Sequence, residues 1–313
     1  MPTPIILDCD PGIDDFIAIM MILAAPERFS LLGITVSGGN VPINFTAQNA
    51  LKACELAERR DVKVYAGCPA PLLRPLVLEE GVHGVEGLKY VNLPTPKMLL
   101  QSTHAVDFLI DTLLNYPQKV TLATTGPLTN VALAIVREPR ILDNIEEIVT
   151  MGGSMCLGNI TPAAEYNFYA DPEAAHILFT SGKKITAVSI DVTHQALTTS
   201  EWMEKLAKMG NPAASAVSAM VQGVHEYDTQ NFETAGGALH DPCVIAYFLD
   251  PSLFKGTDVH VEIDTSHGVT RGRSTIDRWG KRGLTPNAHV FNEFNASGFF
   301  DLLTDLLFRY KRL

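Results

Sequence analysis

The chain has 313 residues, 46% of them apolar, and a formal net charge of −11. This apolar content supplies a large core, and α/β folds of this length often form one unit, so we expect a single domain over residues 1–313. The acidic balance and the absence of a long basic run argue against nucleic acid or an anionic membrane as a partner, because both require clustered Lys and Arg.

The sequence also favours a cytoplasmic location. No apolar run is long enough to span a bilayer, and the N-terminus lacks the pattern of a secretory signal. The five cysteines are scattered without a C-x-x-C pair, which argues against a disulfide framework or a zinc ribbon and favours a reducing compartment. Cys9 and Cys243 lie beside acidic residues, so we interpret them as small apolar fillers, since a reactive thiolate needs cationic neighbours.

Residues 5–15 combine a short apolar run with four carboxylates. These are Asp8, Asp10, Asp14 and Asp15. The run predicts a buried strand, the Pro11-Gly12 pair a turn, and the apolar residues that follow a buried helix. Acids held this close repel one another unless a cation lies among them, and oxygen-rich clusters bind hard cations such as Ca²⁺ or Mg²⁺. A helix-capping role for Asp14 or Asp15 is the alternative, but it leaves Asp8 and Asp10 unexplained.

Strand and helix signals alternate along the N-terminal two-thirds of the chain. The predicted strands are 5–8, 31–36, 62–65, 120–124, 145–151 and 185–190. The predicted helices are 14–24, 44–59, 104–115, 128–137 and 171–181, and residues 67–96 are expected to form a long loop. This alternation predicts an α/β fold with an open, mainly parallel β-sheet flanked by helices on both faces.

The C-terminal third has a different pattern. Residues 200–227 are predicted to be helical with a break at 210–212. Short strands are expected at 260–263, 269–273 and 289–291, including an antiparallel C-terminal hairpin, and an amphipathic helix at 294–310 closes the chain. The fold class is therefore α/β with an additional helical region after residue 199.

Polar residues follow several of the predicted parallel strands. Asp10 comes after the first strand, Asn40 after the second, Thr125 after the fourth, and the polar segment 152–159 after the fifth. In open parallel sheets, ligands bind beyond the carboxyl ends of the strands. These groups are therefore expected to meet at one crevice, and their coincidence is stronger support for a site than any single residue.

Asn159, Glu165 and Asn167 form a second polar group within residues 158–171. Their mixture of carboxylate and amide groups suits hydrogen bonding to a neutral polyol such as a sugar, which needs both donors and acceptors. The alternative is an ordinary turn-rich loop, because Asn is common in turns.

Two histidines have both a structural and a functional interpretation. In His240-Asp241-Pro242, Asp241 fits a helix N-cap with Pro242 in the first turn, which is the interpretation that these residues alone favour. A metal ligand beside a titrating His240 is the alternative, and it is compatible with a cap. His83 lies in the long loop between glycines, where it is either simply solvated or part of a mobile segment over a site. The sequence alone leaves both choices open.

Together these segments resemble the nucleoside hydrolases, metal-dependent N-ribohydrolases of the inosine–uridine-preferring type. Phosphate-loop, dinucleotide-binding and serine-elbow motifs are missing. The two most specific matches are Asp8-Cys-Asp-Pro-Gly-Ile-Asp-Asp15 and His240-Asp-Pro242. The other matching segments are 39–40, 83–88, 125–130, 151–154, 158–167 and 286–288.

The resemblance implies roles for particular residues. Asp10, Asp15 and Asp241 would bind Ca²⁺ through carboxylates and Thr125 through its backbone carbonyl, with Asp10 also the general base for the attacking water. The ribose would be held by Asp14, Asn159, Glu165 and Asn167, helped by Asn40 and Met151. His240 would lie near the leaving base, and His83 and Phe232 are further expected substrate contacts. A nucleoside substrate and a homodimer or homotetramer are also expected.

The base-contacting helix departs from the family pattern. Pyrimidine-preferring and broad-specificity members place Tyr, Gln or Arg side chains before the His-Asp pair, whereas the approximate positions here hold Asp228 and Phe232. The paired tryptophans of the purine-specific type are also missing, since Trp202 and Trp279 lie outside the loop that carries His83. Base preference is therefore not predicted from the sequence.

The chemistry expected of such an enzyme agrees with the acidic cluster. Breaking an N-glycosidic bond develops positive charge on the ribose ring, which carboxylates stabilise. Two other functions compete with this interpretation. One is a Mg²⁺-dependent phosphatase of the haloacid-dehalogenase kind, because Asp8-Cys-Asp10 is similar to the nucleophile motif of those enzymes. The other is a nucleoside-binding protein without turnover.

Overall fold

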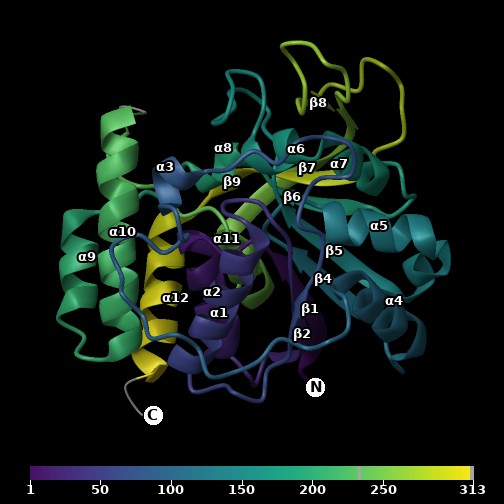
Figure 1. The fold of residues 1–313 in the computed structure, drawn as a ribbon. Helices are drawn as coiled ribbons and strands as arrows, with labels where there is room; N and C mark the ends of the chain where they lie inside the picture. Colours follow the sequence, from purple (N-terminus) through teal and green to yellow (C-terminus); the bar gives the residue numbers. More distant parts are fainter. Residues whose placement is uncertain (232–233, 311–313) are drawn as a thin grey trace.

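The computed structural model describes residues 1–231 and 234–310. Nine strands of this part of the chain form one sheet with the order β3-β2-β1-β4-β5-β6-β9-β7-β8 (Figure 1). The strands are β1 (Thr3–Cys9), β2 (Phe29–Val36), β3 (Val64–Ala66), β4 (Val120–Thr124), β5 (Ile145–Met151), β6 (Ile185–Val188), β7 (Phe254–Ile263), β8 (Ser274–Asp277) and β9 (Ala288–Phe294).

The sheet is parallel from β3 to β9, and β7 pairs antiparallel with both β9 and β8. The predicted α/β fold with a mainly parallel sheet and a C-terminal hairpin is therefore confirmed. The chain runs from β1 to β2 and β3 on one side, and then continues with β4 on the other side. This reversal of strand order next to β1 opens a crevice at the carboxyl ends of β1 and β4.

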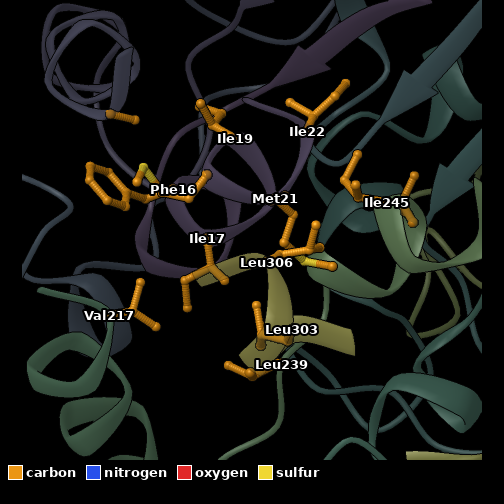
Figure 2. Close-up of a cluster of buried hydrophobic side chains, with 14 of the residues drawn as sticks. Phe16, Ile17, Ile19, Met21, Ile22, Val217, Leu239, Ile245, Leu303 and Leu306 are labelled. Carbon is orange, nitrogen blue, oxygen red and sulfur yellow. The ribbon is translucent and has the colours of Figure 1, made fainter. Parts of the chain in front are cut away.

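Helix α1 (Ile13–Leu23) fills the space under one face of the sheet. All of its residues are buried, as its all-round apolar sequence predicts. It packs against α2 (Ile43–Leu56), α10 (Pro212–Asn231), α11 (Pro242–Leu249) and α12 (Ala296–Arg309). Figure 2 shows Phe16 and Ile17 of α1 in the same cluster as Val217, Ile245 and Leu303 of these later helices.

The other face of the sheet is covered by α4 (Ala105–Asn115), α5 (Thr129–Arg137) and α7 (Pro172–Phe179), so helices lie on both faces as predicted (Figure 1). After residue 199, α9 (Ser200–Ala207) and α10 form the expected helical region and pack against each other. None of the helices in the described part of the chain is long and apolar enough to cross a membrane.

Some predicted boundaries are wrong. Residues 269–273 do not form a strand: Arg271 N donates to Gly268 O at 3.1 Å and Arg273 N to Thr270 O at 2.9 Å, both turn bonds, and Gly272 has a φ of +75°. The second hairpin strand is β8 instead. Helix α2 ends at Leu56 rather than at residue 59, because Glu58 has a φ of 55°.

Short helices were missed because they are set by tertiary contacts rather than by periodicity. They are the α-helices α3 (Glu80–His83), α6 (Tyr166–Ala170) and α8 (Ile190–Thr193) and the 3₁₀-helices η1 (Pro139–Asn144) and η2 (Pro251–Leu253). Three of them, α3, α6 and α8, contribute residues to or next to the cavity described below.

Candidate active site

A cavity with an empty volume of about 850 Å³, partly open to solvent, lies beyond the carboxyl ends of the central strands. Almost all of the predicted site residues line it. They are Asp14, Asn40, His83, Thr125, Met151, Asn159, Glu165, Asn167, His240 and Asp241. Asp10 and Asp15 are fully buried next to it, and Phe232 lies outside the described residues. The expected convergence of strand-end residues therefore holds.

A group of three carboxylates lies at the cavity, with Asp14 and Asp241 in its lining and Asp15 in contact with them. Asp14, Asp15 and Asp241 each place an oxygen within 4.8 Å of the other two, and all three are buried. Asp14 and Asp15 belong to the first turn of α1, whereas Asp241 directly precedes α11. Two segments more than 200 residues apart in sequence thus meet at one point. A cation that takes oxygen ligands would neutralise the three carboxylates there.

Asp10 is connected to this group through Asn40. The backbone N–H of Asn40 donates to Asp10 Oδ2 at 2.7 Å, and its Nδ2 donates to Asp10 O at 3.1 Å and to Asp15 Oδ2 at 3.1 Å. Gly39 and Gly126 approach the Asp10 carboxylate so closely that a Cβ at either position would overlap it. The Asp10 carboxylate is therefore held in one position.

One oxygen of Asp10, Oδ1, is buried without a hydrogen-bond partner in the described chain. Such an orphaned acceptor is costly unless another group satisfies it. Burial, with the nearby Asp15 as a further cause, raises the pKa of Asp10 well above its ordinary value. Burial likewise raises the pKa of Asp15 to about 6 and raises that of Asp241. These all-oxygen residues fit a divalent cation, because its charge would remove the cost of burying them.

The end of β4 is fixed to the same cluster by Thr125 and Asn167. Thr125 Oγ1 donates to Asp15 Oδ1 at 2.7 Å, and Asn167 Nδ2 donates to the carbonyl of Thr125 at 2.8 Å and to that of Met151 at 3.1 Å. The carbonyl of Thr125 retains a second lone pair, so this bond is compatible with cation binding.

Glu165 and Asn159 organise the loop that faces this cluster. Glu165 caps α6 by accepting from the backbone N–H groups of Asn167 at 2.8 Å and Phe168 at 3.2 Å, and it also accepts from Gly153 N at 2.8 Å. Burial raises the pKa of Glu165 to about 7. Asn159 Oδ1 accepts from Tyr166 N at 2.9 Å, which leaves its amide N–H₂ as the donor on the cavity wall.

The structure decides whether the Asp241 side chain caps helix α11. Asp241 occupies the N-cap position of α11, but its side chain makes no capping hydrogen bond, so the capping interpretation is wrong. His240 Nδ1 lies 2.6 Å from Thr193 Oγ1, and the His194 ring centroid lies 5.5 Å from that of His240. Burial lowers the pKa of His240 to about 4, so the imidazole is neutral near pH 7.

His83 is buried, not solvated, and its exposed fraction is 7%. Its Nδ1 accepts a hydrogen bond of 3.0 Å from the backbone N–H of Ile13, the first residue of α1. This bond fixes the neutral tautomer with its proton on Nε2. Residues 67–96 are thus attached to the N-terminus of α1 beside the carboxylates.

Glu79 and His194 also line the cavity and were missed as site residues. His194 follows α8, the short helix that comes directly after β6. The strand-end argument, applied to β6, would therefore have found it. Glu79 precedes α3, a helix of four residues that carries no periodic signal, and no sequence feature pointed to it.

Comparison with known proteins agrees with this geometry. The model of the inosine-uridine preferring nucleoside hydrolase family matches residues 5–301. The "Pyrimidine-specific ribonucleoside hydrolase RihA" of Enterobacter sp. (strain 638) is 41% identical over 311 residues, which cover 99% of each chain. Its Escherichia coli K12 namesake is 41% identical and covers 98% of this chain and 99% of its own.

Solved structures give the same result. The "Purine-Preferring Ribonucleoside Hydrolase" from Gardnerella vaginalis is 31% identical, with a TM-score of 0.91 over 99% of this chain and 100% of its own. A solved plant nucleoside hydrolase is also 31% identical, with a TM-score of 0.90 over 98% and 99% of the two chains. These findings give no support to the phosphatase alternative. The chain belongs to the inosine-uridine preferring nucleoside hydrolase family, and it hydrolyses the N-glycosidic bond of ribonucleosides.

Proposed function

We propose that this hydrolase prefers pyrimidine ribonucleosides, releases ribose and the free base, and holds Ca²⁺ at its carboxylate cluster. The base preference is supported by the relatives of 41% identity, whose names specify pyrimidine nucleosides, whereas the purine-preferring structure is 31% identical. The pocket size is also suitable, because small-ligand sites usually enclose about 300–1,000 Å³.

Asp10, Asp15 and Asp241, with the Thr125 carbonyl, are the proposed Ca²⁺ ligands. All four offer oxygen, which hard cations prefer, and the unpartnered Asp10 Oδ1 is the observation that carries the assignment. A divalent cation bound there would lower the pKa of a water molecule and orient it. Mg²⁺ demands a stricter octahedral geometry, so the flexible requirements of Ca²⁺ favour it in a crowded carboxylate site.

Asp10 is the proposed general base. Its carboxylate is fixed by Asn40, and burial raises its pKa, which makes it a better proton acceptor than an exposed aspartate. A proton taken from the attacking water would be accepted by the Asp10 carboxylate, which the backbone N–H of Asn40 holds in place through Oδ2. The surrounding carboxylates would stabilise the positive charge that develops on the ribose ring.

The ribose hydroxyls are proposed to bind Asp14, Asn159, Glu165 and Asn167, with Asn40 and Met151 beside them. The supporting observation is that all six line the cavity and that their side chains include both acceptors and donors. His240 is proposed to donate a hydrogen bond to the departing base, since a neutral imidazole retains one N–H. His83 and Phe232 remain proposed substrate contacts.

The test measures ribose release from uridine, cytidine, inosine and adenosine by the wild type and by Asp10→Asn. We expect uridine or cytidine to be the best substrate, exhaustive chelation to abolish turnover, and Ca²⁺ to restore it. Full activity after chelation would overturn the metal assignment. Unchanged turnover in Asp10→Asn would overturn the general base and revive the binding-protein alternative.

We further infer that the enzyme forms a homodimer or homotetramer in the cytoplasm. Five free cysteines in the described structure support a reducing compartment. Light scattering of the purified protein would test the assembly, and a monomer at micromolar concentration would contradict it.

A further inference from the structure

Asp228 is a buried carboxylate on the cavity wall that the reaction described above does not use. It lies on α10 with 8% of its surface exposed, and it lines the cavity. Its Oδ2 accepts a hydrogen bond of 2.8 Å from the backbone N–H of Ala238. A carboxylate has lone pairs for several donors, so this single bond leaves acceptor capacity on the side chain.

The position of Asp228 relates it to the base rather than to the ribose. The Ala238 N–H that anchors it belongs to the residue two before His240, so Asp228 is bonded to the segment that carries the histidine proposed to face the base. Val224, one helical turn earlier on α10, lines the cavity as well. The ribose-binding candidates Asn159, Glu165 and Asn167 come from a different segment.

Two hydroxyl groups of the cavity lining donate within the protein. Thr234 Oγ1 donates to Gly236 O at 2.8 Å, and the hydroxyl of Tyr166 donates to Val77 O at 2.7 Å. The described lining includes no Lys, Arg or Gln. Helix α10 therefore presents an acidic side chain, Asp228, to the cavity rather than a cationic or amide one.

We propose that Asp228 selects nucleosides whose base carries an exocyclic amino group, accepting a hydrogen bond from that group and favouring cytidine over uridine. The inference depends on the proposed pyrimidine preference. The cytosine 4-amino group donates, whereas the uracil 4-carbonyl only accepts, so uridine would bring two acceptors together and leave both unpaired. Carboxylates pair with the cytosine amino group in nucleic-acid recognition for the same reason.

The charge state of Asp228 is consistent with this role. Burial raises its pKa to about 6, and Asp14 adds to the increase. The carboxylate is therefore mainly ionised, and hence acceptor-only, at pH 7.5.

The experiment compares kcat/KM for cytidine, uridine and the 4-dimethylamino analogue of cytidine, with Ca²⁺-loaded enzyme at pH 7.5. We expect the wild type to favour cytidine over uridine by about 10- to 100-fold, the range for one well-formed base contact. The dimethylamino analogue lacks the amino hydrogens and should lose most of this advantage, chiefly through a higher KM.

Asp228→Asn is the decisive variant, because its amide keeps an acceptor for Ala238 N–H and adds a donor for the uracil carbonyl. We expect the cytidine-to-uridine ratio to fall at least about fivefold. The matched control is Glu226→Gln, an exposed carboxylate on the same helix, which should leave the ratio unchanged. A ratio is insensitive to the fraction of folded enzyme, so partial loss of folding does not obscure the result.

Three outcomes would overturn the inference. The first is a wild type with equal kcat/KM for uridine and cytidine. The second is an Asp228→Asn variant with an unchanged cytidine-to-uridine ratio. The third is a Glu79→Gln variant that lowers this ratio where Asp228→Asn does not. Each leaves the proposed pyrimidine preference intact. Turnover of purine nucleosides alone would instead refute the proposed preference together with this inference.

Discussion

The inner and outer parts of the cavity are built in different ways. The inner part, around the carboxylates, consists of residues at strand ends, in the first turn of α1 and in the 159–167 loop, and several of its side chains bond to one another, as Asn40 ties Asp10 to Asp15. The outer part comes from α3, the α8 region and α10, where His83 and Asp228 are each anchored by one bond from a backbone N–H, that of Ile13 and that of Ala238.

This difference separates two tasks. Chemistry at the anomeric carbon requires groups fixed to within a fraction of an ångström, which a closed network on strand ends supplies. Recognition of a base depends on which donor or acceptor faces it, and a side chain with one anchor can be exchanged without disturbing the rest. We therefore expect inner substitutions to affect all nucleosides alike and outer substitutions to depend on the base.

The largest effect is expected from Asp10→Asn. Loss of a general base typically costs about 10²–10⁴-fold in rate, and the loss should be the same for every nucleoside. Thermal unfolding of the metal-free variant should occur at or above the wild-type temperature, because a buried charge is removed. A loss of activity that differs strongly between cytidine and inosine would break the proposed division of the cavity.

A smaller and base-dependent effect is expected from His240→Ala. Turnover of natural nucleosides should fall about 10²-fold, because the departing base loses a hydrogen-bond donor. A riboside with 4-nitrophenolate as leaving group, which departs without protonation, should be hydrolysed at nearly the wild-type rate. Equal losses for the two substrate types would show that His240 acts on the inner part instead.

In the metal-free protein, buried acids at and near the inner part should make the free energy of unfolding depend on pH. Burial raises the pKa of Asp8 from 3.8 to about 7 and that of Glu165 from 4.5 to about 7. For these two groups the folded state therefore binds more protons than the unfolded state between pH 4 and 7, so their contribution to stability is largest below this window and is lost as the pH rises through it.

Each unit of pKa difference corresponds to about 1.4 kcal/mol, so the thermal midpoint of chelated protein should fall by several degrees across this window. Ca²⁺ at neutral pH should recover much of the loss, because a ligand that binds only the folded state stabilises it. A thermal midpoint that rises between pH 5 and 7 in chelated protein would contradict the prediction that these acids are buried without a compensating charge.

The smallest effect is expected from His83→Ala, which removes the bond between the outer part and α1. A single buried hydrogen bond contributes about 1 kcal/mol, so stability should decrease by that amount and KM should rise several-fold with little change in kcat. A fall in kcat comparable to that of Asp10→Asn would place His83 with the inner residues.

The sequence predicted the inner part of the cavity far better than the outer part. Alternating apolar segments determined the parallel sheet, and the strand-end argument then brought Asp10, Asn40 and Thr125 together without any structural information. The meeting of Asp15 and Asp241 followed only from the resemblance, because no local pattern connects residues that far apart in sequence. The resemblance grouped them with Asp10, whereas the structure places the carboxylate of Asp14 within 4.8 Å of theirs.

The outer part was harder to predict because its positions depend on tertiary contacts. Helix α3 has four residues and no periodic signal, so Glu79 was missed and the burial of His83 was not foreseen. The N-cap interpretation of Asp241 failed for a related reason: its side chain is drawn into the carboxylate cluster rather than toward the backbone of α11.

The reversal of strand order beside β1 also bears on how the base preference could be changed. The crevice exists because the connection after β1 and the connection after β3 run to opposite sides of β1, so its existence depends on topology and not on any one side chain. We therefore expect that substitutions on α10 can alter the preferred nucleobase while the reactive groups at the strand ends stay unchanged, which offers a route for engineering.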